Sequence, residues 1–443
     1  MKQAIRILST VIFFIGILQA CKKNPTPPIP PPVKPPTITS LNPTSGAFNN
    51  TVTISGTNFN TNPAGDTVRF NGVIATAISA TDSTLKVTVP RGAGTGAVTV
   101  TVNGTTATGP IFTYIYTYIV STIAGNGTEG NVDAAIGINA EFDYPNGVAV
   151  DTLGNIYVAQ TGNPVGGNNT IRLITPAGVV STLAGSSAGY LNGMGTNAQF
   201  ANPWGIALSP QGNIFVADFL YSHIREVTVA GAVTNYAGFS PGYQNGTTAA
   251  AQFQHPTGVA VDALGNVYVA DDYNNAVRMI TPAGMVSTLA GGTAGSANGI
   301  GTNAKFNSIL GITCDSSGTV YVTDNLNAMI RQITPAEVVS TFAGGIQGYK
   351  DDSISTNARF AGPTGITIDK HGNVYVSDQG SCIRKITASG IVTTIAGNAT
   401  QGYADGPGAT AQFSNPFGLA VDSQGNVYVA DRGNQRIRKI TIQ

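Results

Sequence analysis

The sequence predicts an all-β protein: a six-bladed β-propeller of four-stranded blades, its ring closed by a strand from the N-terminal side, together with a smaller β-sandwich domain. Three observations lead to this prediction. Short apolar–polar alternations fill most of the chain, 55 of its 443 residues are glycine, and one pattern recurs six times. Alternation with period two is typical of strands, and glycine is typical of the tight turns between them.

Composition excludes one class of function. The 22 basic residues balance the 22 acidic ones, and charged residues make up only 10% of the chain. A nucleic-acid-binding protein needs a basic face, so that class is set aside. The three cysteines are too few and too far apart for a disulfide framework or a zinc site, and no cofactor is expected. Cys314 and Cys382 lie in strand patterns and are interpreted as small buried residues.

Residues 1–20 are predicted to be an export signal. Lys2 and Arg6 precede an apolar run at 7–17 that is short for a membrane span. The sequence LQAC at 18–21 then resembles a bacterial lipobox, in which cleavage precedes a cysteine that carries lipid. The resemblance implies a lipoprotein acylated at Cys21 and held at the outer membrane, on the periplasmic or the cell-surface side. The alternative is an ordinary signal peptide followed by a coincidental cysteine.

Residues 21–36 are predicted to be the lipidated cysteine and a proline-rich linker. The segment at 22–36, KKNPTPPIPPPVKPP, is rich in proline. Polyproline II rises about 3.1 Å per residue, so this stretch extends roughly 45 Å as a semi-rigid stalk.

Residues 37–115 are predicted to be an antiparallel sandwich, because runs such as TVTISG (51–56) and AVTVTV (97–102) alternate between turn residues. The segments ITSLNPTSG (38–46) and ISGTNF (54–59) resemble the IPT/TIG family of immunoglobulin-like domains. That resemblance implies a spacer or an interaction module.

Residues 116–443 carry the repeats. A glycine followed by an apolar strand recurs at spacings of 58, 53, 53, 54 and 53 residues, at Gly147, Gly205, Gly258, Gly311, Gly365 and Gly418. Each repeat holds four strand patterns, here named a to d from axis to rim; in the third they are GVAVD, NVYVAD, AVRMI and VSTLAG. Four strands repeated six times predict a propeller. These motifs resemble the NHL repeat family, whose propellers often bind proteins or peptides.

The strand count predicts how the ring closes. The repeat region enters with a d-type strand at 118–125 and ends on a c-type strand at 436–442. The entering strand is therefore expected to complete the sixth blade, which removes an open edge. Residues 162–168 are an insertion between b and c of the first blade.

Some side chains repeat in nearly every blade. An Asp ends strand b and an Arg follows six or seven residues later, although Gln160 replaces the Asp in the first blade. Because the pair recurs, it is interpreted as a structural ion pair that joins b to c. The pairs are Asp218–Arg225, Asp271–Arg278, Asp324–Arg331, Asp378–Arg384 and Asp431–Arg438.

The d-to-a loops are long for connections, and each carries a Phe that is interpreted as an anchor. The tyrosines of their Gly-Tyr pairs are either packed or exposed as stacking platforms; these are Tyr190, Tyr243, Tyr349 and Tyr403.

Ligand specificity is expected where the blades differ, at the mouth of the central channel. The candidate residues are Tyr144, Asn202, Trp204, Phe219, Tyr221, His255, Tyr273, Asn415 and Phe417. Flat aromatic rings beside amides suit sugar rings, whose apolar faces stack while their hydroxyls hydrogen-bond. The alternative is that these rings only plug the channel or cover the core.

The sequence therefore favours a non-catalytic, lipid-anchored binding protein of the cell envelope whose ligand is a glycan. Two alternatives stay open: a protein-interaction scaffold, and a metal-dependent lyase or lactonase, since some six-bladed propellers are enzymes. Of the three histidines, only His255 is predicted at the mouth, with His223 in a c strand and His371 in a turn on the opposite face. A three-histidine metal site is therefore not expected, and no catalytic residue is predicted.

Overall fold

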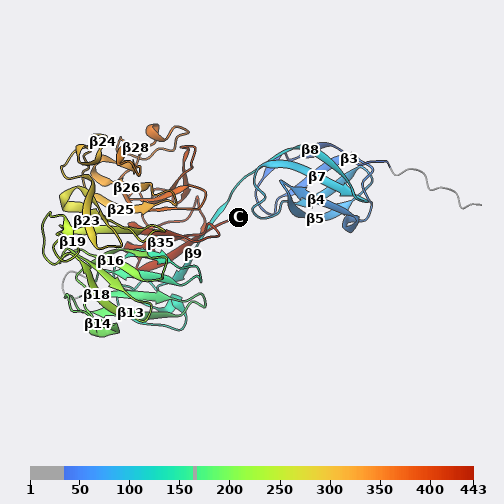
Figure 1. Ribbon diagram of the computed structural model, residues 1–443. Coiled ribbons are helices and arrows are strands. Elements are labelled where there is room, and N and C mark those ends of the chain that lie inside the picture. The colour runs from blue at the N-terminus through green and yellow to red at the C-terminus, as the bar shows by residue number, and fades with distance from the viewer. Residues whose placement is uncertain (1–33, 163–166) are drawn as a thin grey trace, which may run out of the picture.

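The computed structural model describes residues 34–162 and 167–443 as a small β domain followed by a six-bladed propeller (Figure 1). The expected export signal, Cys21 and nearly all of the linker lie outside the described residues, as does part of the insertion in the first blade. The two bodies are joined by the chain between β8 and β9, and the C-terminus lies at this junction (Figure 1).

The small domain is a nearly closed sheet with strand order β1-β3-β6-β5-β4-β7-β8-β2. Alternate side chains point inward, and in β3 the buried positions are Val52, Ile54 and Gly56. Phe70 meets Phe112 edge to face at 4.9 Å in the core. The strands are β1 Thr37–Asn42, β2 Ser45–Gly46, β3 Thr51–Thr57, β4 Asp66–Phe70, β5 Val73–Ala80, β6 Thr84–Thr88, β7 Gly96–Val102 and β8 Thr105–Tyr114, with a 3₁₀ turn at Pro63–Gly65.

Six antiparallel blades form the propeller, each running a to d from the axis outward. The first three are β10 Pro145–Val150, β11 Ile156–Gln160, β12 Asn169–Ile174 and β13 Val180–Ser186; β15 Pro203–Leu208, β16 Ile214–Asp218, β17 His223–Val227 and β18 Ala232–Ala237; and β20 Pro256–Val261, β21 Val267–Asp271, β22 Ala276–Ile280 and β23 Met285–Gly291. The others are β25 Ile309–Cys314, β26 Val320–Asp324, β27 Met329–Ile333 and β28 Val338–Gly344; β29 Pro363–Ile368, β30 Val374–Asp378, β31 Cys382–Ile386 and β32 Val392–Ala396; and β34 Pro416–Val421, β35 Val427–Asp431, β36 Arg436–Ile442 and β9 Tyr118–Ala124. Every b strand is buried along its whole length, because neighbouring blades cover both of its faces.

The sixth blade closes as predicted. Strand β9 pairs with β36 from Ala124 opposite Ile437 to Tyr118 opposite Ile442. Thr117 and Gln443 extend the ladder by exchanging backbone hydrogen bonds of 3.0 and 2.8 Å. The strand that arrives from the small domain thus becomes the rim strand of the last blade and leaves no open seam.

The blades hold more than the four predicted strands. The loop that arrives at a blade adds a short strand outside d in four of them: β14 Gly193–Met194, β19 Gly246–Thr247, β24 Gly299–Ile300 and β33 Gly406–Pro407. In the first and fifth blades a single bridge takes this place. Since each loop starts in the preceding blade, these pairings join neighbours at the rim. The loops also carry 3₁₀ turns at Gly137–Asn139, Gly195–Asn197, Gly301–Asn303 and Ser355–Asn357.

Six glycines form a narrow waist around the axis. A Cβ on any repeat glycine would collide with the backbone carbonyl of the residue before the next blade's glycine; for Gly258 that residue is Leu310. Only glycine lets the a strands approach this closely. A ring of buried apolar side chains continues the wall beyond the waist: Val148, Ile206, Val259, Ile312, Ile366 and Leu419.

Candidate functional site

The repeated arginines organise the long loops. Arg278 is fully buried, and its Nη1 donates to Asp271 Oδ2 at 2.8 Å. Its Nη2 donates to Asn245 Oδ1 at 2.7 Å, and the two nitrogens also donate to two loop carbonyls. The guanidinium carbon lies 5.1 Å from the ring centre of the buried Phe253. One cation thus holds the b strand and the loop together, so the length of the loop is explained by its packing.

The same arrangement recurs around the ring. We call Arg172, Arg225, Arg278, Arg331, Arg384 and Arg438 the hub arginines; all six are fully buried. The Asp partners predicted in the other four blades lie 2.6 to 3.3 Å from their arginines. Burial raises the pKa of Asp218 to about 6 despite the neighbouring cation. Each guanidinium also faces its loop phenylalanine at 4.9 to 5.2 Å.

In the first blade, the arginine pairs with an acidic residue from a different position. Gln160 occupies the Asp position, and its Oε1 accepts from Arg172 at 3.2 Å. The charge partner is Asp133, an exposed loop residue 2.7 Å from Arg172. The first blade therefore keeps its buried arginine, but the carboxylate that pairs with it is exposed and not buried.

The loop tyrosines are both packed and accessible. Tyr243, Tyr349 and Tyr403 each lie over a hub arginine at 4.9 to 5.1 Å, yet each stays 46% exposed. Tyr190 instead meets Tyr221 at 5.2 Å.

At the channel mouth, the structure brings most of the predicted aromatic residues together. Trp204 stacks on Phe219 at 4.7 Å, and Phe219 stacks on His255 at 4.6 Å. Phe417 and Tyr273 meet the two ends of this stack edge to face, at 5.3 and 4.4 Å. We call these five residues the mouth cluster. They come from the second, third and sixth blades, so the cluster forms only when the ring is closed.

The mouth cluster differs from a set of separate stacking platforms. Phe219 lies between Trp204 and His255, and these two rings stack on its two faces. Tyr273 is 61% exposed and offers the most open ring. Tyr221 does not join the cluster: it packs at the rim against Tyr190 and lies 6.1 Å from His223. The accessible part of the cluster is therefore its exposed end and its ring edges.

Backbone geometry fixes the predicted mouth residues that end the d-to-a loops. Tyr144, Asn202, His255 and Asn415 have φ values of 49°, 66°, 51° and 49°. Non-glycine residues in this region cost about 1–3 kcal/mol, least for Asn. A side chain of the preceding blade holds three of them: the N–H groups of Tyr144, Asn202 and His255 donate to Gln435, Asn169 and Ser222 at 2.7 to 3.1 Å. The Asn202 side chain then accepts from Trp204 Nε1 at 3.2 Å. The mouth is thus positioned by the contacts between blades.

Arg432 is a mouth residue that sequence reasoning missed. Its guanidinium carbon lies 5.2 Å from the Tyr144 ring and 6.0 Å from the Phe417 ring. Burial lowers its pKa, and no acidic side chain in the described ranges pairs with it. A signal was present, since the first position after strand b differs in every blade: Thr161, Phe219, Asp272, Asn325, Gln379 and Arg432.

Below the mouth cluster lies a small cavity of about 60 Å³, lined by residues of all six a strands. Asn146 lines it and is wholly buried, and neither atom of its amide has a hydrogen-bond partner among the described residues. Thr257 and Thr364, also in the wall, donate their hydroxyls to carbonyls of the next blade at 2.8 and 3.2 Å. In the wall of this cavity, the Asn146 side chain thus differs from the two threonines, because its amide forms no hydrogen bond with any described residue.

Family models match both parts of the chain. Residues 36–116 match the IPT/TIG domain, and 200–225, 253–278 and 413–440 match the NHL repeat. Further matches are to a beta-propeller repeat at 136–163 and to a teneurin NHL domain at 347–407. The chain combines an IPT/TIG domain with an NHL-repeat propeller.

Known proteins share this architecture at low identity. Protein SUPPRESSOR OF QUENCHING 1 of Arabidopsis thaliana is 28% identical over 288 residues, which are 60% of this chain and 27% of that protein. The chain spans about a quarter or less of the length of such curated relatives. A Bacteroides thetaiotaomicron protein of unknown function aligns with a TM-score of 0.61 and 23% identity, over 93% of this chain and 99% of its own. An auxiliary nutrient binding protein from Bacteroides ovatus aligns with a TM-score of 0.58 and 19% identity, over 93% of this chain and 98% of its own. These structural likenesses show the fold.

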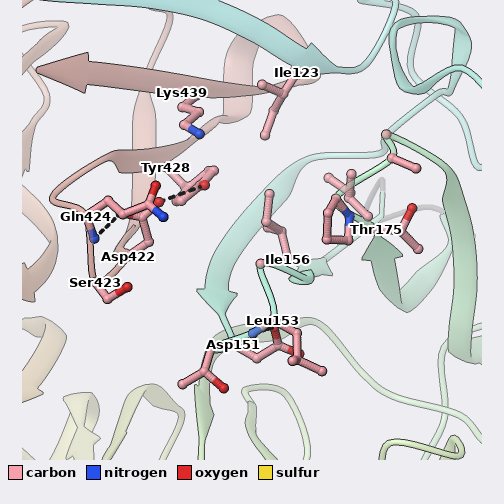
Figure 2. A pocket seen from close by; sticks show the side chains of 16 residues that line it. Ile123, Asp151, Leu153, Ile156, Thr175, Asp422, Ser423, Gln424, Tyr428 and Lys439 are labelled. Carbon is pink, nitrogen blue, oxygen red and sulfur yellow. Dashed lines mark hydrogen bonds between the residues drawn. The ribbon is translucent and has the colours of Figure 1, made fainter. Parts of the chain in front are cut away.

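The NHL propeller has a larger groove on its opposite face, between the first and sixth blades (Figure 2). Its volume is about 460 Å³, and its walls include the turns at Asp151 and Asp422. Figure 2 shows Asp422 accepting from the Gln424 N–H, at 2.9 Å, and from the Tyr428 hydroxyl, at 3.1 Å. These carboxylates already stabilise their own turns, and no predicted site residue lies in the groove.

The three histidines of the NHL propeller lie apart. His223 is in β17, His255 is in the mouth cluster, and His371 is in the turn after β29. Burial lowers the pKa of His223 to about 4, with Arg225 adding to the effect, and burial also lowers the pKa of His255. Within the described ranges no group of three or more His, Cys, Asp or Glu side chains is placed to hold a metal ion. The same ranges contain no helix with the length and apolar character of a membrane span.

Proposed function

We propose that this chain is a non-catalytic binding protein of the bacterial cell envelope, lipid-anchored through Cys21 at the outer membrane, and that its channel mouth recognises a glycan. One observation carries the proposal: aromatic rings and amides converge at the mouth, where the repeats differ. Glycans suit such a site because a pyranose has apolar faces and edges rimmed by hydroxyls.

The geometry supports an ordered, preformed site. Mutual stacking and the hydrogen bond from Trp204 to Asn202 immobilise the rings before a ligand arrives, which lowers the entropic cost of binding. Tyr273 is exposed at the mouth, and the buried amide of Asn146 in the cavity below has no hydrogen-bond partner among the described residues. The likeness to an auxiliary nutrient binding protein of Bacteroides is consistent with a binding role for this architecture.

Affinity electrophoresis of the full chain against a polysaccharide panel tests the proposal. We expect retardation by at least one glycan, and a loss of roughly tenfold in affinity, about 1.4 kcal/mol, in Tyr273→Ala and in Trp204→Ala. Tyr190→Ala, at the rim and 55% exposed, is the matched control. No retardation by any glycan, or an equal loss in Tyr190→Ala, would count against the mouth as a glycan site.

A protein partner is the second candidate, because large apolar side chains are exposed around the second blade. Leu191, Leu220, Tyr221 and Phe239 are 53%, 53%, 41% and 53% exposed. Exposed apolar patches mark protein-interaction sites when they are contiguous. Co-purification from cross-linked membranes separates the two candidates: a protein partner lost in Leu220→Asp but kept in Trp204→Ala favours the scaffold.

The anchor has its own test. Cys21→Ser is expected to move the protein from the membrane fraction to the soluble fraction and to abolish incorporation of labelled palmitate. Protease treatment of intact cells then distinguishes the cell surface from the periplasm. Membrane association that persists unchanged in Cys21→Ser would overturn the anchor.

A further inference from the structure

Arg432 has a different environment from the hub arginines. Each hub arginine donates to loop carbonyls and to at least one acidic side chain, and all six are fully buried. Arg432 is only partly buried, and in the described chain its guanidinium contacts two aromatic rings and no carboxylate. Its Nε is buried with no acceptor among the described residues, while the residue as a whole is half-buried. The planar end of the cation is therefore held in place with its donors unused.

Among the residues that the structure describes, no acidic side chain forms an ion pair with this cation. The equivalent position in the third blade, Asp272, is buried and interacts with Ser308 and Ile309 of the fourth blade. The other equivalents are Thr161, Phe219, Asn325 and Gln379, which are neutral. His255 is also neutral at pH 7, because burial lowers its pKa. In the described part of the chain, the mouth thus combines a neutral aromatic wall with a guanidinium beside Phe417 that has no acidic partner.

Such a guanidinium suits an oxyanion. A planar fork of N–H donors matches a carboxylate or sulfate in a bidentate manner, and charge-assisted bonds are about twice as strong as neutral ones. Stacking on Tyr144 and Phe417 fixes the fork and removes part of its water, so that little order is lost when an anion arrives. The hydroxyls of a neutral sugar can accept hydrogen bonds from these donors, but they leave the positive charge without a counter-charge.

We propose that the ligand of the channel mouth is an acidic glycan, whose carboxylate or sulfate binds Arg432 while its sugar rings rest against the mouth cluster. The inference depends on the proposed glycan-binding function and narrows its ligand class. The two sources of the anion share this chemistry, so the experiment examines both.

Calorimetry on the full chain tests the inference with two matched pairs: oligogalacturonate against its methyl ester, and a sulfated galactan oligomer against its unsulfated form. We expect one acidic member to bind ten- to a hundred-fold more tightly than its neutral counterpart, with affinity falling as salt rises. Arg432→Gln is expected to remove this preference. Arg69→Gln, on the small domain, removes the same charge and should leave the preference unchanged.

The outcomes separate the two proposals. Equal binding of acidic and neutral members, or a preference that survives in Arg432→Gln, would overturn the acidic ligand and leave glycan binding standing. No binding of any member by the wild type would count against both. A thermal melt of Arg432→Gln that matches the wild type shows that a lost preference is not a folding defect.

Discussion

The hub arginines and the channel mouth lie on the same side of the propeller and use their side chains in opposite ways. Under the loops, every blade repeats the arginine and five of the six repeat its Asp partner, and every guanidinium has carbonyl and side-chain acceptors within reach. At the mouth and in the cavity below it, each blade differs: among the described residues Arg432 Nε and the Asn146 amide have no hydrogen-bond partner, and Tyr273 is exposed. Repetition accompanies partnered groups that stabilise the fold. Variation accompanies groups that have no such partners among the described residues.

The largest effect is expected from the feature that completes both regions, the closing strand. Deleting residues 116–125 removes β9 and exposes the edge of β36. We expect the propeller to lose its cooperative unfolding transition, because the sixth blade loses its rim and the ring its closure. Calorimetric melting measures this. An unchanged transition would show that the ring does not depend on β9.

The next effect concerns a hub with a buried carboxylate. Arg278→Met leaves Asp271 buried without its cation and leaves two loop carbonyls without their hydrogen-bond donor. We expect a loss of about 3–5 kcal/mol in the free energy of unfolding, measured by urea denaturation. Adding Asp271→Asn should restore part of that loss. A double variant no more stable than Arg278→Met would show that the stranded charge is not the cause.

The first blade provides a smaller version of the same experiment. Arg172→Met leaves a neutral Gln160 and an exposed Asp133, so no charge is stranded inside. The expected loss is about 2 kcal/mol, from unmet carbonyls and lost packing. The comparison with Arg278→Met isolates the buried carboxylate; equal losses would refute its importance.

A pH effect is expected from His223. Its pKa is lowered from 6.5 to about 4 in the folded chain, so the unfolded chain binds the extra proton first as pH falls. The stabilisation is present above pH 6.5 and is lost as pH falls toward 4. His223→Gln should flatten this part of the stability–pH curve, measured by melts between pH 7.5 and 4.5. An identical slope in both proteins would contradict it.

The smallest effect on stability should come from the mouth. Arg432→Gln removes a cation without an acidic partner, so we expect a change within about 0.5 kcal/mol. Urea denaturation beside Arg278→Met makes the comparison direct. A loss as large as that of Arg278→Met would mean that Arg432 also belongs to the fold.

Repetition explains how much of this could be predicted from the sequence. Six copies of one pattern gave the blades, the closing strand and the Asp–Arg spacing, because each copy corroborates the others. The mouth has no such copies. Trp204 and Phe219 stack within the second blade, but the contacts of Phe219 with His255 and of Trp204 with Phe417 depend on how the blades are placed relative to one another, which no single repeat contains. Asp133 was missed because it lies far along the loop from Gln160, and Arg432 because it stands alone in its blade.

The position of β9 also has a mechanical consequence. The strand connects the small domain to the rim of the last blade, and its first paired residue, Tyr118, faces Ile442 near the chain end. If the chain is held from its N-terminal side while a ligand pulls on the mouth, tension enters the propeller at that pair. The hydrogen bonds between β9 and β36 would then be loaded before those of any other blade. The seam that closes the ring is therefore where force would open it.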